Sequence, residues 1–199
     1  MCVHQFVEYV CTYHSHSFSL KIFWRNRIPD SAPKTNRLIS VDGTDFRIPE
    51  QSDCPKSWYS FKFRGPGLRY ELGLGVFTGK IVWISGPWRA GRFPDITIFR
   101  SGGLRDRLIA AGEKAVADKG YRGEPDTIDL PDEGSESHQA YKKEARSRHE
   151  HCNRRFKQFQ CLGQRFRHKI GFHRECFKAV VVLTELSLEN GEPLWDIFA

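Results

Sequence analysis

Three carboxylates that lie far apart in the sequence are the first candidates for chemistry. Asp42 interrupts the apolar stretch that begins at Leu38, and Asp118 follows the apolar residues 115–117. Glu150 lies in the basic segment "ARSRHEHCNRRFKQF". A buried carboxylate is costly unless it is paired or binds a metal ion, and carboxylate oxygens are hard ligands that suit Mg²⁺ or Mn²⁺. These three residues are therefore candidate ligands of a divalent cation.

The two aspartates also have a simpler interpretation as turn residues. Asp42 precedes Gly43, and Asp-Gly is a common hairpin signal. Asp118 begins the segment "DKGY", whose composition suits a turn. The elements around these residues must decide between a turn and a ligand.

The expected elements follow one another in the order that is typical of the RNase H-like fold. Three antiparallel strands come first, a helix then crosses over to a fourth strand, and two helices follow an acidic, turn-rich loop at 122–140. We therefore expect an α/β protein with a mixed sheet of about five strands, flanked by helices. The fold places the first and fourth strands side by side, so that Asp42 and Asp118 converge. The expected strands are 37–48, 68–77, 81–86 and 114–121, and the expected helices are 96–112 (with a break at Gly102 and Gly103), 143–163 and 175–191.

The helix expected at 143–163 places the third acid beside a buried face. Its apolar stripe at helical spacing consists of Ala145, His149, Cys152, Phe156 and Phe159. Glu150 lies next to this stripe, with Arg146, Asn153 and Lys157 at positions −4, +3 and +7 on one face. The arrangement fits an ordinary surface ion pair, and it equally fits a metal ligand within a phosphate-binding face.

The charge distribution indicates an acidic partner. The formal net charge is +7, and the segment 141–178 alone holds twelve Lys or Arg against three Glu. A local basic patch of this kind neutralises phosphates, although a solvated helix face has the same composition. No apolar run approaches the roughly 20 residues that span a membrane. Six irregularly spaced cysteines and a poor signal peptide suggest reduced thiols in an intracellular protein.

Several motifs in a fixed order carry a resemblance to a known family. They are "VDGTDFRI", "KFRGPGLRYELGL", "IVWISGP", "PDITIFR", "ADKGY", "ARSRHEHCNRRFKQF" and "ENGEPLWD". Together they resemble the DDE endonuclease domain of PIF/Harbinger-type transposases over about residues 22–197. No single motif is specific, but their order and co-occurrence are.

The resemblance assigns roles to individual positions. It implies that Asp42 in "DGT", Asp118 in "ADKGY" and Glu150 in "RHExxN" are the catalytic and metal-binding acids. Asp95, in "PDITIF", is a further candidate for the second acid, with a helix N-cap as the alternative. Asp45 faces away from Asp42 along the strand and is expected to be structural. The contacts to the DNA backbone are expected from Arg146, Arg148, Asn153, Arg154, Arg155 and Lys157.

The resemblance also implies an activity and a setting. We expect a metal-dependent endonuclease that hydrolyses DNA phosphodiester bonds, with strand transfer as a further reaction and two Mg²⁺ (or Mn²⁺) ions bridging the three acids. The expected partners are DNA, a second copy of the chain and a separate DNA-binding protein, in the nucleus. Residues 37–199 are expected to form the catalytic domain. Residues 1–36 are expected to be an N-terminal segment, the remnant of a helical DNA-binding region and too short to contain a whole one.

Other interpretations stay open. One is a catalytically inactive, domesticated DNA-binding protein on the same fold. Another is a zinc module formed by Cys161, His168, His173 and Cys176, although their spacing matches no common zinc finger. Trp88 and Arg89 are candidates to insert beside a distorted base, with simple packing as the alternative.

Overall fold

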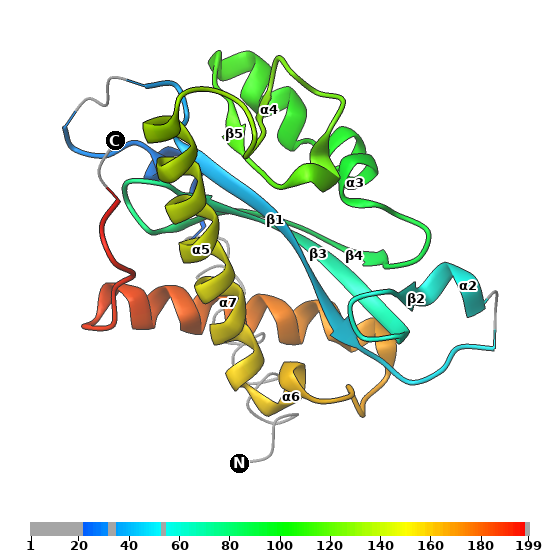
Figure 1. Cartoon of the computed structure of the whole chain (residues 1–199). Coiled ribbons are helices and arrows are strands. Elements are labelled where there is room, and N and C mark those ends of the chain that lie inside the picture. Colours follow the sequence, from blue (N-terminus) through cyan, green and yellow to red (C-terminus); the bar gives the residue numbers. More distant parts are fainter. Residues whose placement is uncertain (1–21, 32–34, 53–54, 198–199) are drawn as a thin grey trace.

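A mixed sheet runs through the centre of the molecule (Figure 1). The computed structural model describes residues 22–31, 35–52 and 55–197, so the expectations for residues 1–21 lie outside the described residues. Among the described residues the sheet has six strands. They are β1 (Ile39–Arg47), β2 (Tyr59–Ser60), β3 (Gly65–Gly75), β4 (Ile81–Arg89), β5 (Ala115–Val116) and β6 (Ile128–Asp129).

The strand order is that of the expected fold class. β1 pairs antiparallel with β3, and β3 pairs antiparallel with β4. β5 then joins the other edge of β1 in parallel, and β6 joins β5 in parallel. The short β2 forms a hairpin with the start of β3. The predicted RNase H-like α/β architecture, with its first three long strands antiparallel, is confirmed.

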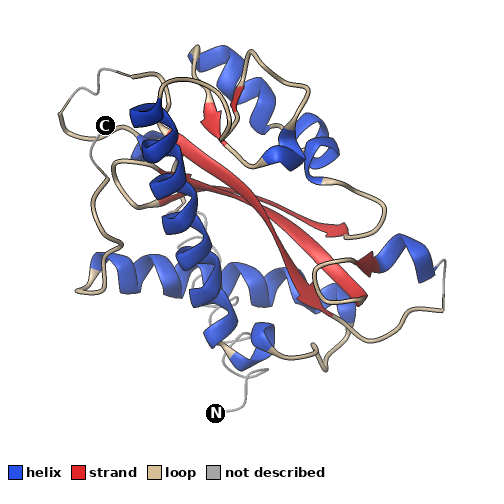
Figure 2. Cartoon of the chain, viewed as in Figure 1, coloured by secondary structure: helices blue, strands red, loops and turns tan. Residues whose placement is uncertain are grey.

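Helices cover both faces of the sheet (Figure 2). The face that carries Phe46, Tyr70 and Leu72 packs against the two long helices of the C-terminal half. The opposite face, with Val41 and Val82, packs against the two short helices that follow β4. The helices are α2 (Pro55–Trp58), α3 (Asp95–Ser101), α4 (Leu104–Ala111), α5 (Glu136–Gln158), α6 (Gln160–Gly163) and α7 (His173–Glu189), with 3₁₀ turns η1 (Trp24–Arg27), η2 (Lys119–Tyr121) and η3 (Ile170–Phe172).

Burial on both faces explains why the long strands are apolar almost without alternation. All but two residues of β1 are buried, and β3 is buried from Gly67 to its end. A strand that is covered on both faces reads as a near-continuous apolar run. The acids within such a strand must therefore be paired or face an opening.

Several boundaries differ from the sequence-based expectation. β4 continues to Arg89 where the strand was expected to end at 86, and α5 ends at Gln158 rather than at 163. The strand expected at 114–121 contains only the two residues of β5, because Asp118 accepts a hydrogen bond from the Gly120 amide and turns the chain into η2. The loop expected at 122–140 contains β6, whose two residues are too few for the alternating pattern of a strand to be recognised in the sequence. α5 begins at Glu136 rather than at 143, because the Ser135 hydroxyl caps the helix by accepting a hydrogen bond from the His138 amide.

Within residues 22–31, 35–52 and 55–197, no helix combines the length and the apolar character that crossing a membrane requires.

Candidate active site

β1 and β5 part just before Asp42, and a cavity opens there. β5 pairs with β1 at Ile39 and Ser40, while α5 packs across β1 from the side of the C-terminal helices. The cavity has a volume of about 280 Å³. The polar side chains in its lining include Asp42, Lys62, Asp118, Arg146, His149 and Glu150. We call this space the acid cavity.

The acid cavity brings together the three acids that the sequence singled out. Asp42 comes from the middle of β1, Asp118 from the turn after β5, and Glu150 from α5. Asp42 and Asp118 are 76 positions apart in the sequence, and Asp118 and Glu150 are 32 positions apart. All three nevertheless line the same cavity. The strand order and the position of α5 therefore bring the three acids together, as the expected fold requires.

Asp42 is held at the floor of the acid cavity by two hydrogen bonds. Its Oδ1 accepts from the Gly43 amide at 2.8 Å, and its Oδ2 accepts from Asn153 Nδ2 at 3.1 Å. The pKa of Asp42 is raised to about 6, mainly by burial; the charge of Lys62 opposes this rise, and the nearby carboxylates of Asp95 and Asp118 contribute to it. A cation in the cavity would relieve this repulsion.

Asp118 and Glu150 are held less firmly than Asp42. Asp118 is half-buried, and its Oδ1 accepts a hydrogen bond from the Gly120 amide at 2.8 Å. The turn that the sequence suggested for this residue is therefore present, and the residue lines the acid cavity as well. The Glu150 side chain is 57% exposed and lies 3.9 Å from Arg154 Nη2. So exposed an ion pair contributes little energy, which leaves this carboxylate free to reorient.

Asp95 lies closer to the other acids than its position before a helix suggested. It is the first residue of α3, and Pro94 occupies the N-cap, so the N-cap interpretation of Asp95 is wrong by one residue. A Cβ atom built on Gly43 would collide with Asp95 Oδ1, and one built on Gly120 would lie 3.3 Å from its Oδ2. Arg69 Nη1 is 3.2 Å from Oδ1. Asp95 therefore reaches the site from the face of β1 opposite to Asp42.

Asp45 is structural, as its orientation along the strand indicated. It is buried and faces Arg69 in the β1–β3 register. Its two oxygens accept from Arg69 Nε at 2.7 Å and Nη2 at 3.0 Å. This paired geometry lowers the pKa of Asp45 although burial alone would raise it. The second acid of "DGTD" thus secures the strand pair under the site.

The donor set suits a hard divalent cation. Burial is the main cause that raises the pKa of both Asp42 and Asp95, and Asp118 lies near them. The buried Asp95 Oδ1 has the ion pair with Arg69 Nη1 at 3.2 Å but no hydrogen bond to a described residue. In the part of the chain that the structure describes, no three His, Cys, Asp or Glu side chains already form a metal-binding cluster. Glu150 lines the acid cavity and lies 3.9 Å from Arg154 Nη2.

Two cationic residues accompany the acids in the acid cavity. Lys62 Nζ donates to the Gly43 carbonyl oxygen from the β2–β3 hairpin, and Arg146 projects from α5. No local sequence pattern marks Lys62, because only the hairpin brings it to β1. His149, also in the lining, is fully buried, and its Nδ1 shares a hydrogen bond of 2.9 Å with Ser40 Oγ. Burial lowers the pKa of His149 to about 3, so its imidazole is neutral.

The remaining basic residues of α5 divide into exposed and internal ones. Arg154 is exposed, and Lys157 is exposed with its Nζ 6.0 Å from the centre of the Phe46 ring. Arg155 Nη1 donates to the Glu192 carbonyl at 2.6 Å, so it is engaged by the C-terminal segment. Asn153 is buried and holds Asp42, which differs from the phosphate contact expected of it.

The expected contact between Arg148 and DNA is wrong in this structure. Arg148 is 1% exposed. Its Nη1 donates to the Trp195 carbonyl at 2.8 Å, and its Nη2 donates to the carbonyls of Gly75 and Val76. Spacing alone placed Arg148 on a basic helix, but the loop after β3 and the C-terminal segment enclose it. Its guanidinium anchors α5 to the sheet.

Two further expectations concern residues outside the acid cavity. His173 Nδ1 shares a hydrogen bond of 2.9 Å with the buried Tyr70 hydroxyl, so this member of the suggested zinc set is engaged in the core. Trp88 donates to Ser85 Oγ at 3.2 Å and its ring lies 5.0 Å from that of Phe93, so simple packing describes it.

One comparison with known proteins found a match. A family model described as "DDE superfamily endonuclease" matches residues 41–185, which is more than half of the 199-residue chain. The matched range contains all of the acids described above. No curated protein and no solved structure matches the chain significantly.

Proposed function

Because the chain belongs to the DDE superfamily of endonucleases, we propose that it is a PIF/Harbinger-type transposase domain that hydrolyses phosphodiester bonds of DNA with divalent metal ions. The observation that carries this proposal is the shared position of Asp42, Asp118 and Glu150 around the acid cavity. Three acids from a strand, a turn and a helix have no structural need to converge. A common ligand supplies the reason.

In the proposed site these three carboxylates hold the metal. Asp95, which lies next to Gly43, is a further candidate ligand. The bound ions, Mg²⁺ or Mn²⁺ and two in number, would supply an activated nucleophile and stabilise the leaving oxygen. Strand transfer to a second DNA would use the same site. The protein's own contribution is then placement of charge and geometry.

Residues of the chain prepare the acid cavity for a phosphate. Asn153 and the Gly43 amide fix the orientation of Asp42, and His149 stays neutral against Ser40. Lys62 and Arg146 place positive charge in the same lining. Contacts between such cations and phosphates give affinity without base specificity and weaken steeply with salt. Exposed Arg154 and Lys157 extend this positive charge along α5.

Wider aspects of the proposal follow from the same chemistry. The proposed partners are a second copy of the chain, so that two DNA ends are cut together, and a separate DNA-binding protein that recognises the ends. DNA as the substrate supports a nuclear location. These partners are proposals that binding assays with the purified chain address directly.

The direct experiment measures Mg²⁺-dependent nicking of supercoiled DNA. We expect Asp42→Ala, Asp118→Ala and Glu150→Ala each to abolish nicking and to weaken Mn²⁺ binding measured by calorimetry. Glu144→Ala is the matched control, because Glu144 is exposed on the same helix outside the acid cavity. Wild-type nicking in all three acid variants would overturn the proposal.

The alternative function is a domesticated DNA-binding protein that has lost catalysis. The 3.9 Å contact between Glu150 and Arg154 favours it, because the Arg154 guanidinium competes with a metal ion for this carboxylate. DNA binding without nicking, together with no Mn²⁺ binding by the wild-type chain, is the result that selects this alternative.

A further inference from the structure

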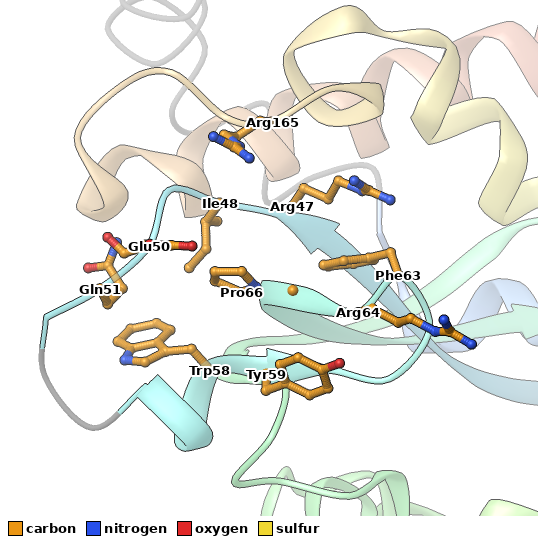
Figure 3. A pocket seen from close by; sticks show the side chains of 11 residues that line it. Arg47, Ile48, Glu50, Gln51, Trp58, Tyr59, Phe63, Arg64, Pro66 and Arg165 are labelled. Carbon is orange, nitrogen blue, oxygen red and sulfur yellow. The ribbon is translucent and has the colours of Figure 1, made fainter.

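A second cavity lies beyond the C-terminal end of β1, beside the β2–β3 hairpin (Figure 3). Its volume is about 350 Å³. Three aromatic rings and three guanidinium groups take part in the lining, from Arg47, Trp58, Tyr59, Phe63, Arg64 and Arg165. Figure 3 shows the rings around the cavity and the arginines at its margin. We call this space the aromatic cavity.

The lining combines flat apolar surface with positive charge. Glu50 is the acid among the lining residues, against three arginines, so the margin is net positive. Arg47, Arg64 and Arg165 are exposed, and the Arg47 guanidinium lies 4.9 Å from the centre of the Phe63 ring. Aromatic and guanidinium planes stack on nucleobases, and guanidinium groups bind phosphates in a fork. The charge and shape complement a nucleotide.

The hairpin next to the aromatic cavity presents aromatic surface to solvent. Phe61 is 85% exposed and Tyr59 is 37% exposed, and their rings meet edge to face at 5.2 Å. Exposed rings grouped on one hairpin mark an interaction site. Because a base that is paired within a duplex has both faces covered, such rings accept only an unpaired base.

Arg64 adds a conformational argument. Its φ of 55° lies in the left-handed region that side chains other than glycine rarely adopt. Strain of this kind persists where the surroundings impose it and is concentrated at functional sites. Here it places an exposed guanidinium at the margin of the aromatic cavity.

One stretch of chain connects the two cavities. Lys62 lines the acid cavity and donates to the Gly43 carbonyl, and the next two residues, Phe63 and Arg64, line the aromatic cavity. Along β1, Asp42 and Arg47 are separated by roughly 17 Å at the usual rise of a strand. A single DNA strand covers that distance in about five base steps. A strand that is cut at the acids can therefore reach the aromatic cavity.

We propose that the aromatic cavity binds an unpaired nucleotide of the same DNA that is cleaved at the acid cavity. The base stacks on the rings of Tyr59 and Phe63, and the flanking phosphates lie against Arg47, Arg64 and Arg165. This inference rests on the proposed function and adds a substrate preference to it, namely DNA with a single-stranded extension next to the cleaved bond.

The experiment compares a blunt duplex with the same duplex carrying a single-stranded extension of about six nucleotides that contains 2-aminopurine. Affinity and 2-aminopurine fluorescence are measured with the full chain in EDTA, so that cleavage plays no part. We expect the extension to tighten DNA binding about five-fold or more. We also expect the fluorescence of 2-aminopurine to be quenched when the base stacks on the aromatic rings. Tyr59→Ala should remove the quench, and Tyr59→Phe should retain it.

The charge variants separate the aromatic cavity from general electrostatics. We expect Arg64→Ala and Arg165→Ala to reduce the preference for the extension. Arg167→Ala is the matched control, since Arg167 is exposed two residues from Arg165 without lining the cavity. It should weaken binding of both DNAs equally. Circular dichroism of each variant verifies that it is folded.

The outcomes are distinguishable from a failure of the proposed function. No preference for the extension, or a quench that persists in folded Tyr59→Ala, overturns the inference even when nicking still depends on Asp42. Nicking that does not depend on Asp42, with the preference and the quench intact, instead overturns the proposed function and leaves the nucleotide site standing.

Discussion

Asn153 on α5 donates a hydrogen bond of 3.1 Å to Asp42 on β1, across 111 positions of sequence. The contact joins the helix that carries Glu150 to the strand that carries the first acid. It also stabilises the ionised form of Asp42, whose pKa burial raises to about 6. Asn153 is thus a positioning residue for the candidate metal site.

Asn153→Ala should therefore lower nicking by about 10–100-fold, the usual effect of losing a group that orients a metal ligand. Since the lost hydrogen bond favoured the carboxylate, the pKa of Asp42 should rise and the acid limb of the pH–rate profile should move to higher pH. Gln158→Ala, an exposed change on the same helix, is the control. An unchanged pH profile in Asn153→Ala would contradict the assignment.

Asp42→Asn should inactivate the protein and at the same time stabilise it. The folded-state pKa of Asp42, about 6, lies above its ordinary value of 3.8. The stabilisation from this group is therefore present below about pH 4 and is lost as pH rises through 6. At pH 8 the variant should gain about 1–3 kcal/mol in the free energy of unfolding, measured in urea. A gain that is equally large at pH 3.5 would argue against this origin.

Gly43→Ala should disturb the site through Asp95. The added Cβ would collide with Asp95 Oδ1, and an overpacked core typically loses about 1–3 kcal/mol. Asp95→Ala removes the obstacle, so the double variant should be more stable than the two single effects predict. A double-mutant cycle in urea measures this coupling. Strictly additive effects would show that the two residues do not meet.

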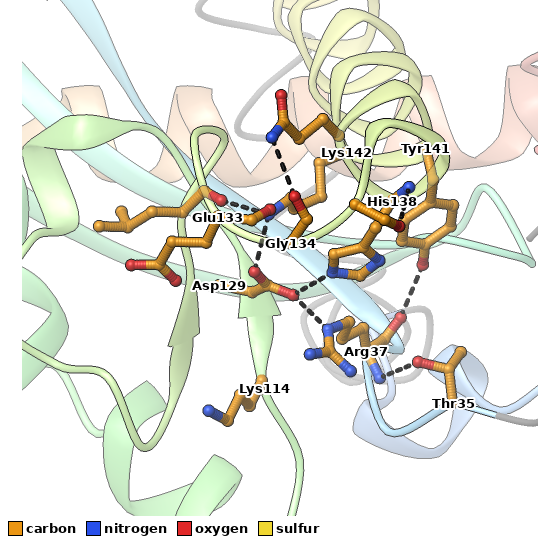
Figure 4. A network of polar contacts seen from close by, with 12 residues as sticks. Thr35, Arg37, Lys114, Asp129, Glu133, Gly134, His138, Tyr141 and Lys142 are labelled. Atoms are coloured by element: carbon orange, nitrogen blue, oxygen red, sulfur yellow. Dashed lines mark hydrogen bonds and ion pairs between the residues drawn. The ribbon is translucent and has the colours of Figure 1, made fainter.

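Asp129 should be a main determinant of acid stability. It lies at the centre of a buried network and accepts hydrogen bonds from Arg37, His138 Nε2 at 2.8 Å and Lys142 Nζ at 3.0 Å (Figure 4). Despite burial, these donors lower the pKa of Asp129 to about 2. Its stabilisation is therefore present above pH 4 and is lost as pH falls through 2.

The variant Asp129→Asn leaves the fully buried Lys142 without its ionic partner. We expect a loss of about 2–4 kcal/mol at pH 7, measured by urea denaturation, and a smaller loss near pH 2. Asp126→Asn, an exposed change three residues earlier, serves as the control and should have little effect. Equal losses at both pH values would contradict the ionic origin.

Arg64→Gly should separate stability from binding. Glycine tolerates a φ of 55° without steric strain, so the variant should gain about 1 kcal/mol in the free energy of unfolding. It should also lose preference for DNA with a single-stranded extension, because a guanidinium is removed. Arg167→Gly is the control and should show no gain in stability. A less stable Arg64→Gly would mean that other contacts of Arg64 outweigh its strain.

The sequence by itself determined the order of the elements and the acids that they carry. Apolar runs marked β1, β3 and β4, and the stripe from Ala145 to Phe156 on α5 is buried as its spacing indicated. This works because a side chain's direction relative to its own strand or helix follows from spacing alone. The shared position of Asp42 and Asp118 then followed from the expected strand order.

Only the tertiary structure decided what surrounds each side chain. Spacing placed Arg148 on a basic helix face, but carbonyl groups from distant segments enclose its guanidinium. Spacing likewise placed Asp95 before a helix, but packing brings its carboxylate next to Gly43. Lys62 reaches the acid cavity only because the β2–β3 hairpin packs against β1. The aromatic cavity needs the same hairpin and also Arg165, which lies about a hundred residues further along the chain. Burial and charge pairing depend on contacts between different elements. A local sequence pattern does not specify which other element a given helix or strand will pack against.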